Sequence, residues 1–263
     1  MRSILTAVTV FVATVILAPT VIVARLLGLG ERVPQWAMRT WAQTICAAGG
    51  ARLAVHNPEN MLTGRGCVYA SNHVSWFDVF AVASVIPRYT FIAKSELRRI
   101  PLFGWGAESA GVVFLARENR KAAFESYHGA AAEVARGRSV VVCPEGTRGY
   151  EYALRPFKKG PFVLAIAAKA PVVPVLVYGA REVMPKGSFR VRSGTVHIHF
   201  LEAVETAGCD YDHRHEVMQA VWDRMADCLR REYGIASKGQ AIVDAAVEPT
   251  VQPAAEPTVE RTA

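Results

Sequence analysis

Hydrophobic and polar positions follow a regular order along the chain, in which short apolar runs alternate with longer helical patterns. The apolar runs predict buried strands at residues 66–70, 89–93, 111–115, 139–143 and 172–178. Helical patterns fall between them at 76–85, 121–136 and 161–169, and a closing helix is expected at 213–232. This alternation predicts an α/β fold, built as a layered, largely parallel sheet with flanking helices.

Two strand-like segments carry unusual side chains. Between residues 195 and 201, apolar residues alternate with His197 and His199, which predicts a strand that is exposed on one face. We expect these two histidines to be solvated and not to bind a metal. Pro171 and Pro174 lie in the other segment. Because proline lacks a backbone N–H, we expect that strand at a sheet edge or at a strand start.

The chain begins with an uncharged apolar run. Residues 3–24 contain no charged side chain and lie between Arg2 and Arg25, which is long enough to cross a bilayer. A signal peptide would need a cleavage site that the sequence does not clearly show. A spanning helix fits, and so does a helix that is interrupted at Pro19 and turns back within one leaflet. We expect a membrane-embedded segment, and the arginines that follow it place the body on the cytoplasmic face.

A second helix is expected at residues 35–48, with Trp36 and Trp41. Indole rings favour the membrane–water interface, and packing in the core explains them equally well. The chain then divides into three parts: a membrane-associated helical segment at 1–48, an α/β domain at 49–235, and a tail at 236–263. The tail is rich in proline, alanine and glutamate, and we expect it to be disordered.

The charge and the cysteines indicate the kind of partner and the redox compartment. The formal net charge is +7, and the excess lies outside the acidic tail. A basic body indicates an anionic partner such as lipid headgroups, a phosphorylated substrate or nucleic acid. The five cysteines are scattered without a C-x-x-C pair, which favours buried free thiols in a reducing compartment over disulfides or a zinc site.

The segment SNHVSWFDVF, residues 71–80, places His73 and Asp78 within an apolar stretch. Ser75 and Asp78 match a capping box, in which a serine and an acid three residues later satisfy free N–H groups at a helix start. That pattern does not explain His73, which precedes the cap. A proton-handling pair and an ordinary helix start are both compatible with this stretch alone.

Three further stretches carry cations at the ends of strands or helices. In VVVCPEGTRGY, residues 140–150, a strand runs into a turn with Arg148, whose planar guanidinium suits phosphate, although a plain turn with an ion pair also fits. The strand at 111–115 is followed by Arg117. Lys158 and Lys159 stand at a helix start, where cations are unfavourable unless they meet an anion.

Together these stretches resemble the glycerolipid acyltransferases of the 1-acyl-sn-glycerol-3-phosphate (lysophosphatidic acid) acyltransferase type. Four blocks of that family occur in order: NHVSWFD at 72–78, GVVFLAR at 111–117, CPEGTRG at 143–149 and a V-P-V-like strand at 171–175. The intermediate pieces KSEL at 94–97 and FKKG at 157–160 also match. The resemblance covers about residues 50–205.

The resemblance implies an enzyme that moves a fatty acyl group from acyl-CoA or acyl carrier protein to the free hydroxyl of lysophosphatidic acid. The product would be phosphatidic acid in the membrane, and neither a cofactor, a metal nor a nucleic acid is implied. His73 would be the general base and Asp78 would orient it. The sequence has no G-x-S-x-G, so we expect direct transfer without an acyl-enzyme.

The resemblance also implies a binding site for the acceptor. Its residues would be Arg117, Glu145, Gly146, Thr147 and Arg148. Lys94, Lys158 and Lys159 are further candidates for the phosphate or the thioester carrier, and a solvated basic face is the alternative for these lysines.

Three positions depart from the family's pattern. Ala116 stands in place of an aspartate, Cys143 in place of a phenylalanine and Gly149 in place of a serine. They leave the acceptor open, so another lysolipid such as a lyso-ornithine lipid remains an alternative. A hydrolase that uses the histidine on water and a non-catalytic lipid-binding membrane protein also remain.

Overall fold

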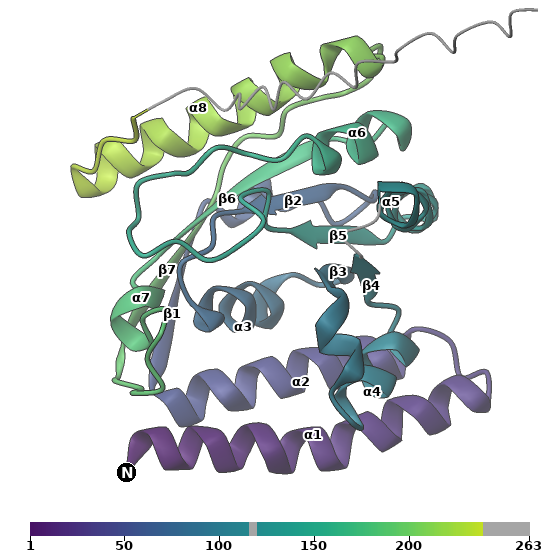
Figure 1. The fold of residues 1–263 in the computed structure, drawn as a ribbon, viewed down its shortest axis with the longest axis vertical. Coiled ribbons are helices and arrows are strands. Elements are labelled where there is room, and N and C mark those ends of the chain that lie inside the picture. The colour runs from purple at the N-terminus through teal and green to yellow at the C-terminus, as the bar shows by residue number, and fades with distance from the viewer. Residues whose placement is uncertain (116–119, 239–263) are drawn as a thin grey trace, which may run out of the picture.

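The computed structural model describes residues 1–115 and 120–238 (Figure 1). Its strands are β1 (Ala51–His56), β2 (Val68–Ser71), β3 (Tyr89–Lys94), β4 (Val113–Leu115), β5 (Ser139–Val142), β6 (Val172–Tyr178) and β7 (Gly194–Phe200). Its α-helices are α1 (Arg2–Leu26), α2 (Arg32–Gly49), α3 (Trp76–Val85), α4 (Phe103–Ser109), α5 (Arg120–Ala135), α6 (Gly160–Ala167), α7 (Ala180–Val183) and α8 (Arg214–Tyr233). Three short 3-10 helices connect them: Pro58–Asn60, Ser95–Arg99 and Tyr211–His213.

The strands form one mixed sheet in the order β1-β7-β6-β2-β5-β3-β4. Every pair is parallel except β6 and β7, which are antiparallel. The predicted α/β fold with a largely parallel sheet is therefore confirmed. Of the predicted apolar runs, β2, β5 and most of β6 are buried on both faces, as a covered parallel sheet requires. β3 and β4 lie towards one edge of the sheet and are only partly buried.

Helices cover both faces of the sheet (Figure 1). On one face α5, α6 and α8 pack over an apolar core that includes Phe162, Leu176 and Met225. On the other face α2 and α3 pack over a second core that includes Ile45, Phe77 and Ile198. Helix α1 lies outside α2 as an additional layer. The two cores fix the sheet, and with it the strand ends that carry the candidate chemistry.

The expectation for the proline strand is half wrong. Pro171 precedes β6, but Pro174 lies within β6, which is an interior strand between β2 and β7. The pairing of β6 with β7 begins at Val175 and Phe200, and the carbonyl of Pro174 accepts the N–H of Leu201. The N–H that proline lacks therefore falls at the end of the ladder, where its absence breaks no hydrogen bond between strands.

The expectation for the β7 histidines is also wrong in part. His199 is only 4% exposed, and its Nε2 lies 2.7 Å from the hydroxyl of Tyr233 on α8. His197 is half-buried, and its Nδ1 lies 3.0 Å from Nε2 of His56 on β1. The face expected to be solvated is covered because α8 packs across it. Within the described residues, no group of three metal-ligating side chains is arranged to hold a metal ion.

Helix α1 lies lengthwise against the body and continues through Pro19, so of the two membrane-embedded alternatives the interrupted helix is not the one observed. Three contacts hold it. The N–H of Val191 donates to Ser3 Oγ at 2.9 Å, Trp41 Nε1 donates to Thr14 Oγ1 at 2.9 Å, and Gly106 of α4 lies directly against Ala18. A side chain at Gly106 would place its Cβ only 2.6 Å from that of Ala18.

The outer face of α1 is apolar and exposed. Its exposed large side chains are Ile4, Leu5, Val8, Phe11, Val12, Val15, Ile16, Val23 and Leu26. Trp36 of α2 and Trp105 of α4 are exposed as well, whereas Trp41 packs inwards against Phe80 and Phe103. By length and composition alone, α1 could cross a membrane, and it is near the N-terminus. These features support membrane association of the N-terminal segment.

Candidate active site

The predicted site residues gather where parallel strands end. His73 follows β2, the segment Glu145–Arg148 follows the neighbouring β5, and Lys94 closes β3. The carboxyl ends of parallel strands meet at one edge of a sheet, which is the usual place for a site in an α/β protein. A cavity of about 1250 Å³ opens there. The predicted residues that line it are His73, Lys94, Glu145, Gly146, Thr147, Arg148, Lys158 and Lys159.

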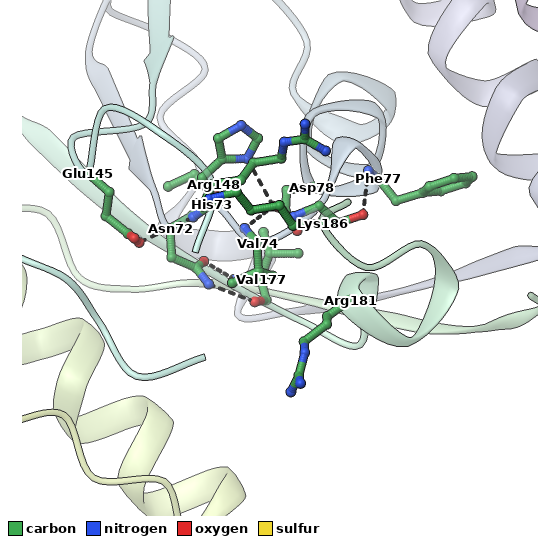
Figure 2. Close-up of polar contacts among 12 residues, drawn as sticks. Asn72, His73, Val74, Phe77, Asp78, Glu145, Arg148, Val177, Arg181 and Lys186 are labelled. Atoms are coloured by element: carbon green, nitrogen blue, oxygen red, sulfur yellow. Dashed lines mark hydrogen bonds and ion pairs between the residues drawn. The ribbon is translucent and has the colours of Figure 1, made fainter. Parts of the chain in front are cut away.

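The His73 and Asp78 side chains are paired (Figure 2). His73 Nδ1 lies 3.1 Å from Asp78 Oδ2. The imidazole is 15% exposed, while the carboxylate is 1% exposed. The same Oδ2 accepts the backbone N–H groups of Val74 at 2.6 Å and Ser75 at 2.7 Å. The backbone N–H groups of Val74 and Ser75 therefore fix the carboxylate, and the carboxylate fixes the imidazole.

The capping box predicted from the sequence is present in the same place. Ser75 is the N-cap of α3, and its Oγ accepts the N–H of Phe77 at 3.1 Å, while Asp78 accepts the N–H of Ser75. The two interpretations of this stretch are thus compatible. The cap holds Asp78 at the positive end of a helix, and the oxygen that accepts the two backbone N–H groups, Oδ2, is also the one that faces His73.

The main chain of His73 is held from both sides. Its N–H donates to Glu145 Oε1 at 3.3 Å, and its carbonyl accepts the N–H of Gly149 at 2.7 Å. The preceding residue, Asn72, is 1% exposed, and its side-chain amide exchanges two hydrogen bonds with the main chain of Val177 on β6 (Figure 2). The segment after β5 and the middle of the sheet therefore determine where His73 lies.

Glu145 is a buried acid with an unusual charge state. Its residue is 4% exposed, and this burial raises the pKa of its carboxyl to about 8. The N–H of His73 and the charge of Arg155 act in the opposite direction, and the nearby Asp78 raises the pKa further. The carboxyl is consequently mostly neutral at pH 7. The structure thus brings Glu145 to the backbone of His73, which the sequence did not predict.

Arg148 provides a cation beside the first turn of α3. Its guanidinium lies 4.9 Å from the centre of the Trp76 ring, so it stacks on the first residue of α3. No carboxylate of the described residues lies within salt-bridge distance of it. Thr147 beside it is exposed, and Gly146 has a φ of 77°, which only glycine adopts without strain. A guanidinium in this state can accept an anionic group from a ligand.

The other predicted cations have different surroundings. Lys94 is exposed and paired with Glu96. Lys158 and Lys159 are exposed and line the cavity at the start of α6. Arg117 and Ala116 lie outside the described residues. Of the two other departures from the family pattern, Cys143 lines the cavity and Gly149 holds His73.

The cavity has a polar end and an apolar end. His73, Glu145 and Arg148 form the polar end. The apolar walls come from the N-terminal helices and the sheet, and include Leu17, Val21, Met38, Trp41, Phe80 and Phe103. Such a space can take a molecule with an anionic head and a long hydrocarbon chain. α1 therefore forms one wall of this cavity in addition to the apolar outer face of the protein.

Sequence analysis missed three residues that hold this site. Asn72 was part of the NHVSWFD block, and a polar side chain directly after a buried strand is a signal for it. Arg155 donates to the carbonyls of Thr147 and Arg148, and its place in RPFKKG gave only a hint. Lys186, whose Nζ donates to the carbonyl of Arg148 at 2.7 Å, lies in a loop without any recognisable pattern.

Comparison with known proteins agrees with this geometry. The family model Acyltransferase matches residues 52–178. An uncharacterized acyltransferase of Schizosaccharomyces pombe is 33% identical over 71% of this chain and 68% of its own. A 1-acyl-sn-glycerol-3-phosphate acyltransferase of Saccharomyces cerevisiae is 31% identical over 73% of this chain and 63% of its own. The crystal structure of the 1-acyl-sn-glycerophosphate (LPA) acyltransferase PlsC from Thermotoga maritima matches with a TM-score of 0.71 and 26% identity, over 86% of this chain and 97% of that one.

The matched proteins are named as acyltransferases, and the Thermotoga structure shares the α/β fold of this chain. The chain belongs to the acyltransferase family. It spans 34% to 65% of the length of the first curated relatives that it matches. The resemblance drawn from the four sequence blocks is confirmed at the level of the family.

Proposed function

We propose that this protein transfers a fatty acyl group from an acyl thioester to the free hydroxyl of 1-acyl-sn-glycerol-3-phosphate, giving phosphatidic acid. The observation that carries the proposal is the His73–Asp78 pair, 3.1 Å apart, with His73 on the wall of a cavity that both cationic and apolar side chains line. The names of the Saccharomyces and Thermotoga relatives support the choice of acceptor.

The reaction uses one proton-carrying side chain. Asp78 accepts the Nδ1–H of His73, which leaves Nε2 free to take the proton of the acceptor hydroxyl. As that proton leaves, the hydroxyl oxygen forms a bond to the thioester carbonyl carbon, and the carbon–sulfur bond then breaks. The thiolate that departs takes a proton from the imidazolium, so His73 returns to its starting state. The carboxylate stabilises the imidazolium between these steps.

Arg148 would bind the phosphate of the acceptor. It has a guanidinium without a carboxylate partner among the described residues, and it lies beside the first turn of α3. Lys158 and Lys159 would meet the phosphates or the acidic surface of the acyl donor, because they are exposed at the rim of the same cavity. Acyl-CoA and acyl carrier protein both present such charges.

Helix α1 would lie in the membrane along its length. It is held against the body at Ser3, Thr14 and Ala18, so only its outer face is available to lipid, as for an amphipathic helix that lies in one leaflet. The arginines after it support a position of the body on the cytoplasmic face. Phe11→Glu should reduce flotation of the protein with anionic phospholipid vesicles, whereas Phe11→Leu should not. Equal flotation of both variants would contradict this placement.

One assay tests the proposed function directly. The purified protein in phospholipid vesicles receives a radiolabelled acyl thioester, as acyl-CoA or acyl carrier protein, and a panel of lysolipids with and without a phosphomonoester. We expect labelled phosphatidic acid from lysophosphatidic acid. Transfer only to another lysolipid, or release of free fatty acid without an acceptor, would contradict the proposal and favour one of the alternative functions.

A further inference from the structure

A loop outside every sequence block contacts both halves of the candidate active site. It follows α7 and leads to β7, and its ends are joined by a hydrogen bond of 2.9 Å from the N–H of Arg192 to the carbonyl of Val183. This bond closes residues 184–191 into a defined loop. The loop therefore has fixed ends, and the residues within it can hold their neighbours in place.

Two contacts connect this loop to the site. The hydroxyl of Ser75, the N-cap of α3, donates to the carbonyl of Met184 at 2.7 Å. The ammonium group of Lys186 donates to the carbonyl of Arg148, also at 2.7 Å. Figure 2 shows Lys186 beside Arg148. The first contact fixes the start of α3, and the second fixes the segment after β5.

The contacts of Met184 and Lys186 hold the main chain on both sides of the stacking interaction between Arg148 and Trp76. The guanidinium of Arg148 stacks on the ring of Trp76, and Trp76 directly follows Ser75. The loop thus holds the main chain next to the ring and the main chain of the arginine at the same time. Their separation, and with it the direction of the guanidinium, depends on a loop of which neither is a part.

Lys186 is well placed for this task. Its Nζ also lies 4.2 Å from the centre of the Tyr150 ring, which restrains the ammonium group. No carboxylate of the described residues lies within salt-bridge distance of it. Arg155 reaches the same carbonyl, but its Nη1 is shared between Thr147 at 3.2 Å and Arg148 at 3.3 Å. The bond from Lys186 to this carbonyl is the shorter one.

We propose that Lys186 is a positioning residue for the acceptor's phosphate, acting through the main-chain carbonyl of Arg148 and not by contact with the substrate. The proposal rests on the proposed function, because it takes Arg148 as the phosphate-binding group. Loss of the ammonium group would let the segment after β5 move and would weaken the binding of the phosphate. The Gly149 N–H that holds His73 belongs to the same peptide, but Asn72 and the backbone bonds of Asp78 also hold the His73–Asp78 pair, so its geometry should change little.

The first experiment measures the KM for lysophosphatidic acid and the kcat of Lys186→Ala and Lys186→Arg. A charge-assisted hydrogen bond of this kind contributes enough for a rise in KM of about tenfold in Lys186→Ala, with kcat changed by less than about twofold. Lys186→Arg keeps a charged donor and should restore most of the affinity. An unchanged KM in Lys186→Ala, or no restoration in Lys186→Arg, would overturn the proposal.

A double-mutant cycle separates positioning from a direct attraction between Lys186 and the phosphate. If Lys186 acts through Arg148, adding Lys186→Ala to Arg148→Ala should leave the KM unchanged within about twofold. Additive effects of the two changes would mean direct contact and would contradict the proposal. Melting temperatures of all variants show whether the fold is intact.

Arg181→Ala is the matched control. Arg181 is an exposed cation on α7, next to the same loop, and Figure 2 shows its side chain directed away from His73 and Asp78. We expect its KM to equal that of the wild type, since the loss of one nearby positive charge alone should not matter. Absence of transfer to lysophosphatidic acid by the wild type would overturn the proposed function and this inference together, whereas transfer with an unaffected Lys186→Ala overturns only the inference.

Discussion

Two groups of histidines in this protein differ in the neighbours of their rings. His73 faces the carboxylate of Asp78 at the edge of a cavity. His56, His197 and His199 face one another on β1 and β7, where the rings of His56 and His199 are parallel with centres 4.1 Å apart. Both groups are partly buried and both are hydrogen-bonded, so burial and bonding do not distinguish them.

The difference lies in the charge that each neighbour can carry. A carboxylate stabilises an imidazolium, so His73 can accept a proton and hold it briefly. Neighbouring imidazoles do the opposite. Burial and the nearby His56 lower the pKa of His199 to about 4, although Glu232 acts against them. His199 therefore stays neutral at pH 7, and its hydrogen bond to Tyr233 helps to pack α8 against the sheet. A histidine becomes a candidate base through its carboxylate partner.

The largest effect should come from His73→Ala. Loss of the general base should reduce kcat by about 10³-fold or more while the protein stays folded, because the main chain at this position is held by Glu145 and Gly149. Steady-state transfer to lysophosphatidic acid measures this. His56→Ala is the control from the other group and should keep kcat within about twofold. Equal losses of kcat in the two variants would show that the two groups of histidines do not differ in function.

Asp78→Asn should give the next largest effect. The amide has no negative charge and can no longer stabilise the imidazolium, so kcat should fall by about 10² to 10³-fold. The substitution also disturbs two backbone hydrogen bonds at the start of α3, so a modest fall in melting temperature is expected. A kcat within about threefold of the wild type would show that His73 does not need the carboxylate.

Glu145→Gln should change how the stability of the protein depends on pH. The folded-state pKa of Glu145, about 8, exceeds its ordinary value of 4.5, so the folded protein holds this proton more tightly than the unfolded chain. Stability should fall as pH rises from about 5 to 8. Glutamine does not titrate, so the free energy of unfolding of the variant should not show this fall. The difference in free energy of unfolding between variant and wild type should therefore shift in favour of the variant by on the order of 2 kcal/mol from pH 5.5 to pH 8.5. Urea unfolding at both pH values measures this, and parallel curves would contradict it.

His199→Gln should give the smallest effect and the opposite sign of pH dependence. The folded-state pKa of His199, about 4, lies below its ordinary value of 6.5, so the unfolded chain binds the proton more tightly. Its contribution to stability is complete above about pH 6.5 and is lost as pH falls towards 4. As pH falls from 7 to 5, the free energy of unfolding of the variant should decrease by on the order of 1 kcal/mol less than that of the wild type. An identical loss in both would mean that His199 does not titrate in this range.

The sequence predicted the parts of the molecule that local patterns determine. Helix α3 was predicted at 76–85, which are its observed bounds, because a capping box marks its start and an apolar run continues it. The residues that follow β2, β3 and β5 do lie along one cavity. Whether the predicted residues catalyse or bind substrate remains a prediction, as does the division into three segments.

Three elements escaped prediction because their signals are weak or distant. β1 pairs with β7, which is more than a hundred residues away, so nothing near Ala51–His56 indicates the strand. α7 has four residues, too few for a periodic pattern, and α4 begins after several turn residues. The burial of His199 depends on α8 crossing the sheet, and the contact between Lys186 and Arg148 joins segments 38 residues apart.

Gly106 shows how a residue without a side chain can set the spacing of two helices that line a cavity. Its hydrogen atom is all that separates α4 from Ala18 of α1, so the two helix axes lie as near to each other as any residue permits. Ala18 and Gly106 both line the cavity, so this close approach brings two of its walls together. A larger residue at 106 would separate α4 from α1 and so change the shape of the cavity that His73 also lines.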